Sequence, residues 1–419
     1  MKLVLKSLLL LSILFVVSTQ TFADGGEPAL NDSNVATLQE PFTFKFKNNA
    51  TLKYYGKIEM VSYYDTTTPF VSDWLAFVYP DTNYDGTQES FSMAVRASLF
   101  GFNFNLPDVW GSADLNAKLE MDFVGGYSTG TTTAYTPLVR MKQAWFSLDT
   151  EHFSFLAGQA FGVFGPLFPD NCAWIALGSS GNPWIRVPQL RVTVKDKHWK
   201  WEVSANRSMA FDETLGGTLD DIMSDGEQSA LPMMMSRLGY TGKIGSVDVA
   251  TGISGTYGRE KYYRNSATAV IDKDLSYYMG VFDLFLGSKY VDFKGEAFYG
   301  ENLNTFYAGI LQGVTESDAN ADGINDDVNG IGSMGGWAQF TFKPTSKWAF
   351  NLGGGIEDTD NADLAATGRA YNFTGYVNGI YKPSKWLSFT LEPCFTRTGY
   401  NGGTSNDNIR GTFRTAFMF

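Results

Sequence analysis

The stretch that decides the fold is Phe153–Val194, which reads FSFLAGQAFGVFGPLFPDNCAWIALGSSGNPWIRVPQLRVTV. It opens with a strand-like run and closes, from Gln189 to Lys195, in an alternation of polar and apolar residues. The residues between hold prolines and glycines, which weaken a sheet ladder, yet they are too apolar for a loop exposed to water. These apolar residues are Phe164, Leu167, Phe168, Trp174, Ile175, Leu177 and Trp184. A long loop of this kind must pack against the rest of the protein, and such loops commonly carry function.

Outward from this segment, the same alternation recurs along most of the chain. Its clearest example runs from Ala113 to Phe123, where every second residue is apolar and the others are polar or charged. A soluble sandwich seldom contains many such segments of about ten residues, the length that a tilted strand needs to cross a bilayer. The pattern predicts sixteen strands, an even number, as a closed antiparallel barrel requires. They lie at 52–65, 91–103, 111–124, 138–149, 153–163, 189–195, 199–206, 233–241, 244–256, 275–286, 289–300, 331–342, 347–357, 369–381, 386–397 and 409–419.

The predicted connections alternate between short and long. Short turns of a few residues join neighbouring strands at one end of the predicted barrel, for example at 149–151, 196–198 and 382–385. The long connections are 66–90, 125–137, 164–188, 207–232, 257–274, 301–330, 358–368 and 398–408. Short periplasmic turns and long external loops produce this rhythm in outer-membrane barrels. The final residues, Phe413–Phe419, alternate aromatic and other side chains and end on Phe, which is typical of the last strand of such a barrel.

The first residues read as a secretory signal peptide, Met1–Ala23. Lys2 and Lys6 form its positive end, and the apolar stretch that follows is too short to span a membrane as a helix. Residues 24–50 are polar and weakly patterned, so we expect a short, mostly extended periplasmic segment before a barrel domain at 51–419.

Composition excludes several classes of protein. There is no second long apolar run, which excludes a helical membrane protein. Aromatic residues make up 15% of the chain, there are 44 glycines, and charged residues make up only 18%, as expected for short aromatic strands. Without Lys2 and Lys6 the chain keeps 30 basic and 44 acidic residues, a net charge of −14 that argues against nucleic-acid binding.

Three runs of sequence stand out: LVRMKQAWFSLD (Leu138–Asp149), LAGQAFGVFGPLFPD (Leu156–Asp170) and GNPWIRVPQLRVT (Gly181–Thr193). Together they resemble the DcaP-like family of outer-membrane porins. The resemblance implies a sixteen-stranded barrel in the outer membrane of a Gram-negative bacterium, assembled as a homotrimer and surrounded by outer-membrane lipid. It also implies small anionic solutes such as dicarboxylates. In general porins the third external loop folds into the lumen and narrows it, which would explain the apolar segment at 164–188.

The sequence contains no recognisable arrangement of catalytic residues. His152 and His198 are the only histidines, and both fall in predicted periplasmic turns. No Ser–His–Asp or Cys–His arrangement can be assembled, and the ligand spacings of zinc sites are missing. We therefore expect a channel and not an enzyme.

Basic residues fall on the non-lipid face of the predicted strands. The expected pore-lining or constriction residues are Arg96, Lys118, Arg140, Lys142, Asp170, Arg186, Arg191, Arg237, Arg410 and Arg414. One interpretation is general: any water-filled barrel interior is charged, and several carboxylates share this face. The sharper interpretation is a basic wall opposite a loop, which would favour anions. Of these residues Arg96, Arg140, Arg191, Arg410 and Arg414 are predicted to set the selectivity.

Two external loops have the spacing of calcium-binding loops. In one, oxygen ligands would come from Asp318, Asn320, Asp322, the carbonyl of Ile324, and Asp326. In the other, they would come from Asp81, Asn83, Asp85, the carbonyl of Thr87, and Glu89. The glutamate that completes an EF-hand is absent from both, so the alternative is an acidic, turn-rich loop.

The two cysteines are expected to face one lumen. Cys172 lies in the apolar segment and Cys394 on the inward phase of strand 386–397. In an oxidising compartment they could form a disulfide that fixes the loop to the wall, and the alternative is two unpaired thiols.

Together these features predict an outer-membrane porin for passive diffusion of small hydrophilic solutes, with small anions such as (di)carboxylates favoured. The alternative is a non-conducting barrel that acts as an adhesin or receptor through calcium-ordered external loops.

Overall fold

A computed structural model describes residues 42–46, 49–80, 88–125, 137–173, 175–209, 225–265, 270–318 and 323–419. The predicted signal peptide, residues 1–23, and most of segment 24–50 lie outside these ranges. Within them, no helix is both long and apolar enough to cross a membrane.

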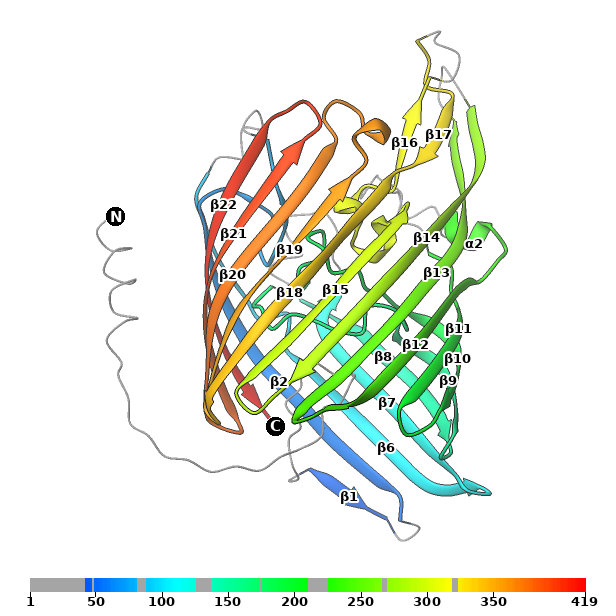
Figure 1. Cartoon of the computed structure of the whole chain (residues 1–419), viewed down its shortest axis with the longest axis vertical. Helices are drawn as coiled ribbons and strands as arrows, with labels where there is room; N and C mark the ends of the chain where they lie inside the picture. The colour runs from blue at the N-terminus through cyan, green and yellow to red at the C-terminus, as the bar shows by residue number, and fades with distance from the viewer. Residues whose placement is uncertain are drawn as a thin grey trace, which may run out of the picture.

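The described strands close into one antiparallel barrel (Figure 1). Eighteen described strands share the main sheet. β5 and β6 both pair with β2 and are two parts of one wall strand, and β1 only extends the sheet beside β2. The wall of the barrel therefore has the predicted sixteen strands. Closure is made by the last strand, which pairs with the first from Lys57↔Met418 to Asp65↔Arg410. The wall strands are β2 (Thr51–Asp65), β5 (Ser90–Ala94) with β6 (Leu99–Trp110), β7 (Ala113–Gly125), β8 (Leu138–Asp149), β9 (Phe153–Phe161), β10 (Arg186–Lys195), β11 (Trp199–Asn206), β12 (Met233–Ile244), β13 (Val247–Asn265), β14 (Val270–Gly287), β15 (Val291–Glu301), β18 (Gly332–Thr345), β19 (Trp348–Thr359), β20 (Arg369–Ser384), β21 (Leu387–Tyr400) and β22 (Ser405–Met418).

Alternation along each strand separates an apolar exterior from a polar interior. On β7, Lys118, Glu120 and Asp122 are buried inside the barrel, while Leu119 between them is 39% exposed outside. Aromatic rings gather near the short turns: Trp199 lies 5.0 Å from Tyr240 between ring centroids, and Trp348 lies 4.6 Å from Tyr381. Such a girdle is the usual feature of the membrane–water interface of a barrel.

The second wall strand is interrupted, which corrects the continuous strand predicted at 91–103. Ala94 pairs with Val61 of β2, and Leu99 pairs with Lys57 of β2. The chain from Ala94 to Leu99 is one residue longer than the stretch of β2 that it faces. This extra residue forms a bulge, and a bulge re-aims the side chain that it carries. Here it turns Arg96 inward, where its guanidinium pairs with Asp73.

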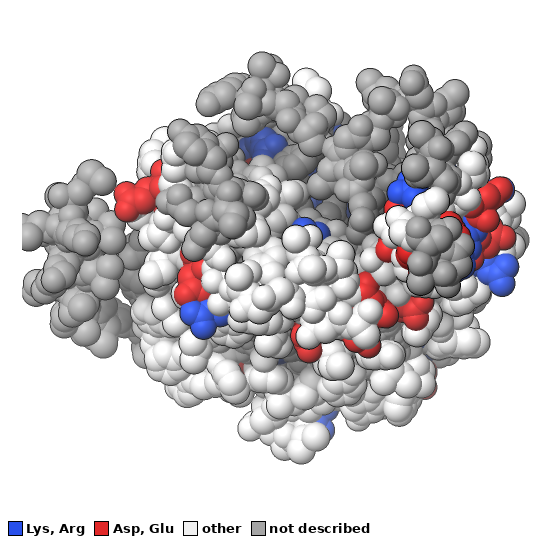
Figure 2. Space-filling model, turned by 90° about the horizontal axis from the view of Figure 1, so that it is seen from above, with Lys and Arg blue, Asp and Glu red and all other residues white. Residues whose placement is uncertain are grey.

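The long loop predicted at 257–274 is instead mostly strand. β13 and β14 stay paired from Asp248↔Gly287 to Asn265↔Val270 and project beyond the rest of the barrel (Figure 1). A second hairpin, β16 (Val314–Ser317) with β17 (Asp327–Gly330), packs beside them. Lys273 on β14 reaches Asp327 at 2.8 Å. Seen from above, acidic and basic side chains gather over this tower of two hairpins (Figure 2).

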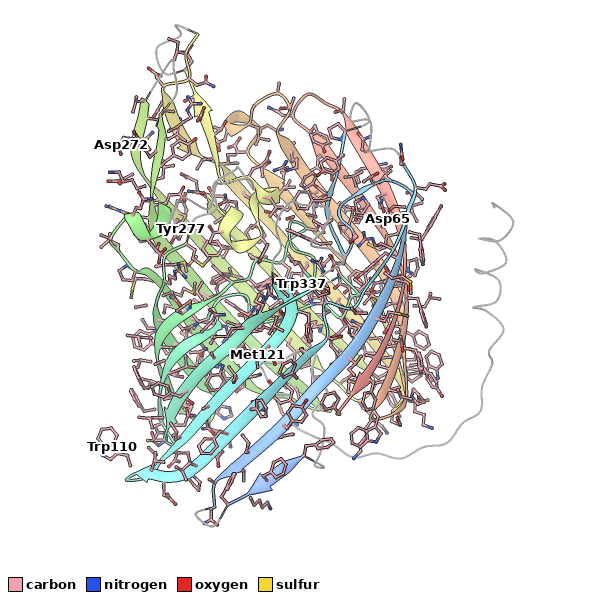
Figure 3. The ribbon with its side chains drawn as sticks, turned by 180° about the vertical axis from the view of Figure 1, so that it is seen from behind. Asp65, Trp110, Met121, Asp272, Tyr277 and Trp337 are labelled. Carbon is pink, nitrogen blue, oxygen red and sulfur yellow. The ribbon has the colours of Figure 1, made fainter. Side chains whose placement is uncertain are left out.

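The remaining elements are short and belong to the connections. They are β1 (Thr43–Lys45), β3 (Pro69–Val71), β4 (Trp74–Val78), α2 (Asp225–Gln228), η1 (Asn304–Phe306), η2 (Gly309–Leu311) and η3 (Asn361–Asp363). β1 pairs with β2 where β22 has ended, so it extends the wall at the end of the barrel that carries the short turns. Trp110 stands away from the barrel at this same turn end (Figure 3).

Candidate functional site

The β9–β10 segment, residues 162–185, contacts strands on the opposite side of the closed sheet. The backbone N–H of Leu167 donates to Glu296 on β15 at 2.7 Å. The backbone N–H of Cys172 donates to both carboxylate oxygens of Glu392 on β21 at 3.0 Å. Both carboxylates are buried on the inner face of the wall. They supply acceptors that a loop without regular structure would otherwise lack.

Asp170, expected at a constriction, lies at the centre of this contact. Its carboxylate pairs with Lys294 at 2.8 Å and accepts from Gln339 at 2.8 Å. Its backbone N–H donates to Gln339, and its carbonyl accepts from Asn378, both at 2.7 Å. Asp170 therefore fixes the segment to β15, β18 and β20.

The apolar side chains of the segment pack against two other connections. Trp184 lies 4.8 Å from Tyr307 between ring centroids, and Trp74 of β4 lies 5.7 Å from the same tyrosine. Ile175 and Ile310 complete this buried cluster. The cluster explains why a proline-rich connection carries so many large apolar residues: three connections bury them together.

A third wall carboxylate, that of Glu357, anchors the connection that carries η2. Glu357 on β19 accepts from the backbone N–H of Ile310 and from the hydroxyl of Ser333, each at 3.2 Å. Arg369 donates to the carbonyl of Ile310 at 2.7 Å. Both connections thus rest on one half of the wall, formed by β15 and β18–β21.

Open space remains against the other half of the wall, as a cavity of about 530 Å³, here called the central cavity. It is lined by β2, β5–β10, Arg414 of β22, Asp73 of the first long connection and part of the β9–β10 segment. Among its lining residues, seven are basic and four are acidic. The basic residues are Lys57, Lys118, Arg140, Lys142, Arg186, Arg191 and Arg414, and the acidic residues are Glu59, Asp73, Glu120 and Asp122.

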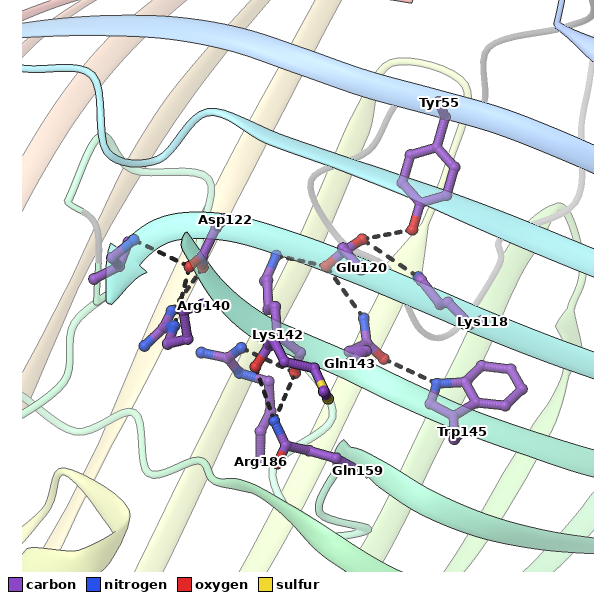
Figure 4. A network of polar contacts seen from close by, with 12 residues as sticks. Tyr55, Lys118, Glu120, Asp122, Arg140, Lys142, Gln143, Trp145, Gln159 and Arg186 are labelled. Atoms are coloured by element: carbon purple, nitrogen blue, oxygen red, sulfur yellow. Dashed lines mark hydrogen bonds and ion pairs between the residues drawn. The ribbon is translucent and has the colours of Figure 1, made fainter. Parts of the chain in front are cut away.

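One buried carboxylate organises the lysines of this cavity (Figure 4). Glu120 pairs with Lys142 at 2.9 Å and with Lys118 at 3.6 Å, and it accepts from the hydroxyl of Tyr55 at 2.7 Å. Gln143 donates to it at 3.4 Å. Two lysines around one carboxylate leave a net positive charge on this stretch of wall.

The next carboxylate along β7, Asp122, holds Arg140 in a two-pronged ion pair, with distances of 3.0 and 2.6 Å. Lys57 pairs with Glu59 at 2.8 Å. Arg191 pairs with Glu202 at 3.4 Å. These three cations line the central cavity, but each has a carboxylate neighbour.

Arg186 and Arg414 differ, because no salt bridge within the described ranges includes them. Arg186 donates to the carbonyl of Lys142 at 3.3 Å and lies 5.3 Å from the ring of Trp184, while its buried Nε has no hydrogen-bond partner. Arg414 donates to the carbonyl of Asn171 and to Thr390, both at 3.3 Å. Glu59 and Glu392 act on Arg414 electrostatically without reaching salt-bridge distance.

Besides Asp170, three of the ten expected residues do not line the central cavity and form structural ion pairs instead. Arg96 pairs with Asp73, Arg237 with Asp283 at 2.7 Å, and Arg410 with Asp65 at 2.7 Å. All six side chains are buried. Arg96 and Arg410 hold the first long connection against the wall, since Arg410 also donates to the carbonyl of Ser72 at 3.2 Å.

Cys172 and Cys394 are free thiols in this structure, which is the second of the two alternatives that the sequence left open. The segment is indeed held on β21, but by the Glu392 carboxylate through the backbone of Cys172. The Cys394 sulfur lies 4.0 Å from the hydroxyl of Thr396. Burial, with the nearby Glu392 charge, raises the pKa of the Cys172 thiol well above its ordinary value, which keeps it protonated at neutral pH.

The two calcium-like loops fall largely outside the described residues. Of the expected ligands, these are Asp81, Asn83, Asp85, Thr87, Asn320 and Asp322. In the described part, Asp318 accepts from the backbone N–H of Gly323 at 2.6 Å. Across the described ranges no group of three or more His, Cys, Asp or Glu side chains is placed to hold a metal ion. Calcium binding therefore stays a prediction.

Sequence reasoning missed several residues of the site. Lys57, Tyr55 and Gln143 line or order the central cavity. Tyr55 and Lys57 had a signal, since they alternate with the apolar residues of β2. Gln143 is out of phase with Arg140 and Lys142 and faces inward only because the β7–β8 register shifts between Glu120↔Gln143 and Met121↔Met141. The anchoring role of Glu296 and Glu392 had no local signal, because it depends on which wall the β9–β10 segment contacts.

No family model and no curated protein matches the sequence. Solved structures do match. The outer membrane channel DcaP of Acinetobacter baumannii is similar with a TM-score of 0.71 and 18% identity, over 90% of this chain and all of that one. The anion-selective porin of Comamonas acidovorans gives a TM-score of 0.56 and 10% identity, over 88% of this chain and 100% of that one.

Outer-membrane OmpT of Vibrio cholerae gives a TM-score of 0.54 and 11% identity, over 90% of this chain and 100% of that one. At such low identity these similarities show the fold. It is the closed barrel of porins from the Gram-negative outer membrane, as the sequence resemblance implied.

Proposed function

We propose that the protein is a porin that lets small hydrophilic solutes diffuse passively across the outer membrane and favours small anions such as mono- and dicarboxylates. The observation that carries this proposal is Arg186. It lines the central cavity next to Arg140 and Lys142, forms no salt bridge with a carboxylate of the described ranges and presents a buried Nε without a hydrogen bond. A passing carboxylate can supply both the missing charge and the missing acceptor.

The charge of the cavity supports the same preference. Seven basic and four acidic residues line it, and the acidic ones are engaged by Tyr, Lys or Arg neighbours. An opposite charge 4 Å from a guanidinium gains about 1 kcal/mol in water and more where water is restricted. Trp184 and Phe161 beside Arg186 restrict water there. Passive diffusion requires no catalytic group, so the proposal includes no enzymatic activity.

Similar proteins support the proposal at a coarser level. The solved structures that match are outer-membrane proteins, and one of them is described as an anion-selective porin. The resemblance of the segment at 138–193 adds a homotrimeric assembly to the proposal.

Swelling of proteoliposomes tests the proposal. Vesicles with the purified protein should swell faster in salts of small mono- and dicarboxylates than in neutral sugars of similar size, and protein-free vesicles should do neither. Faster entry of the sugars would overturn the anion preference. An absence of swelling in every solute would overturn the channel itself.

The alternative is a non-conducting barrel that acts as an adhesin or receptor. One observation favours it: the tower formed by β13–β14 and β16–β17 projects beyond the other strands and carries exposed Tyr263 and Val270. Under this alternative the vesicles would stay impermeable and removal of the tower would abolish binding of the protein to its target surface.

A further inference from the structure

A second cavity of about 780 Å³ opens at the turn end of the barrel and is here called the turn-side vestibule. β1, β2 and β6–β11 form its lining. Five of the lining residues are basic and two are acidic. They are Lys45, Lys53, Arg191, Lys195 and Lys200, with Asp149 and Glu202. The vestibule thus carries a formal excess of three positive charges.

The two carboxylates leave most of this charge free. Glu202 is shared by Arg191 at 3.4 Å and Lys200 at 3.1 Å. Asp149 accepts from Asn116 at 2.7 Å and from the hydroxyls of Ser147 and Ser154. Lys195 acts on Asp149 electrostatically, but the salt bridges of the described ranges include neither Lys195 nor Lys53.

Strand register places these lysines on the inner face. Lys53 on β2 lies opposite Asn103 on β6, which also lines the vestibule. Lys195 on β10 lies opposite Lys200 on β11. Like charges directly across a strand pair are destabilising. The ion pair of Lys200 with Glu202 offsets part of this repulsion, and an anion bound beside Lys195 would offset the rest.

The vestibule is continuous with the central cavity. Asn103, Trp145, Leu156 and Arg191 line both. A solute that leaves the neighbourhood of Arg186 therefore meets Arg191 next and then the vestibule lysines. Successive sites of one charge let an ion enter each site and leave it again, as conduction requires.

We propose that the turn-side vestibule is a second binding site, specific for small polycarboxylates with at least two negative charges. This inference rests on the proposed anion channel and adds a second anion-binding site to it. Lys53 on β2 and Lys195 on β10 stand on different parts of the lining, and each binds a carboxylate group there. Asn103, Asn116 and Thr193 offer neutral polar contacts. One negative charge would leave part of the excess uncompensated, so a dianion or trianion fits better than a monoanion.

Lysine footprinting tests this site in the full-length purified protein. Citrate is the probe, and brief acetylation followed by mass spectrometry gives the modification rate of each lysine. Citrate should slow acetylation of Lys53 and Lys195 about fivefold or more, which is the effect of roughly 1 kcal/mol of binding at each ammonium group. Lys347 and Lys382 are internal controls, since both are exposed near other short turns and neither lines the vestibule. Their rates should not change, and an equal concentration of sorbitol with chloride at matched ionic strength should protect none of the four.

Equal acetylation of all four lysines in citrate and chloride would overturn the proposal. The variant Lys53→Gln/Lys195→Gln gives an independent readout, because citrate should then block the single-channel current about tenfold more weakly than in wild type. Lys347→Gln/Lys382→Gln should keep the wild-type block, and unchanged block in the first variant would also contradict the site. If the protein proved non-conducting yet footprinted, the vestibule would stand and only the channel function would fall.

Discussion

Arginine has two different roles inside this barrel. Arg96, Arg237 and Arg410 form buried two-pronged pairs with aspartates and hold connections or neighbouring strands together. Arg186 and Arg414 line the central cavity without such a partner. The inward phase is common to both groups, so the role of each arginine depends on the presence of a nearby carboxylate.

The first prediction concerns the unpaired group. Arg186→Gln/Arg414→Gln should lower the chloride-to-potassium permeability ratio about fivefold, because the two removed charges together take away roughly 1 kcal/mol of attraction for an anion. Zero-current potentials under a salt gradient measure the ratio. Arg397→Gln is the matched control, since Arg397 is exposed, pairs with Asp407 and lines neither cavity, so its ratio should equal that of wild type. A double variant that keeps the wild-type ratio would refute the role of these two arginines.

The second prediction concerns the paired group. Arg410→Met should destabilise the barrel by about 3–5 kcal/mol, because Asp65 is completely buried and would keep an uncompensated charge. Urea unfolding in lipid vesicles measures the loss. Asp65→Asn/Arg410→Met should recover much of the stability, since it removes both charges together. A single variant as stable as wild type would show that the pair is not buried as described.

Among the elements, the β9–β10 segment depends on the wall opposite to its own strands. Glu392→Ala removes the acceptor for the Cys172 backbone and for Asn378. The hydrogen bonds of the sheet are untouched, so the barrel should still form. The β9–β10 segment should then move more freely, and the single-channel current should become noisier, with larger maximal steps when the segment leaves the lumen. Glu227→Ala is the control, because this carboxylate pairs with Arg207 outside both cavities. Quiet, wild-type currents in Glu392→Ala would contradict the anchoring role.

The turn between β10 and β11 gives a pH-dependent prediction. The backbone N–H groups of Trp199 and His198 donate to Asp196, each at 2.7 Å, and lower its pKa below the ordinary value. A depressed folded-state pKa contributes stability above the unfolded-state pKa, and this is lost as pH falls through the folded-state value. Asp196→Ala should therefore lower the melting temperature at pH 7, and the difference from wild type should shrink in acid. A difference that is constant with pH would contradict this origin.

The strands could be predicted well from sequence, but the connections could not. Alternation located β8 at Leu138–Asp149 and β11 at Trp199–Asn206 with the correct bounds, because a lipid exterior and a polar interior impose a period of two. The same alternation continues through Tyr263 and Val270, where it was interpreted as loop although the hairpin extends beyond the bilayer. A period alone does not show where a bilayer ends.

The candidate site was predictable only in part for the same reason. The alternation of inward and outward residues along the strands correctly placed Lys118, Arg140 and Lys142 at the central cavity. It could not show that Arg410 meets Asp65 or that Cys172 meets Glu392, because these contacts join residues that are hundreds of positions apart. Pairing between distant segments decides which inward charges a solute can reach.

The whole molecule is divided into two unlike halves. The connections rest on β15 and β18–β21, where Glu296, Glu357 and Glu392 bind backbone N–H groups. The central cavity and the turn-side vestibule lie against β22, β2 and β5–β11, where the excess positive charge is found. A solute path along a single basic wall follows from this division, and its field would act on anions before they reach Arg186.

The most direct test of this account is the zero-current potential of single wild-type channels in planar bilayers under a potassium chloride gradient. The account predicts stable conductance steps and a potential whose sign corresponds to preferential chloride flow. A potential of the opposite sign, or a protein that inserts without conducting, would contradict it.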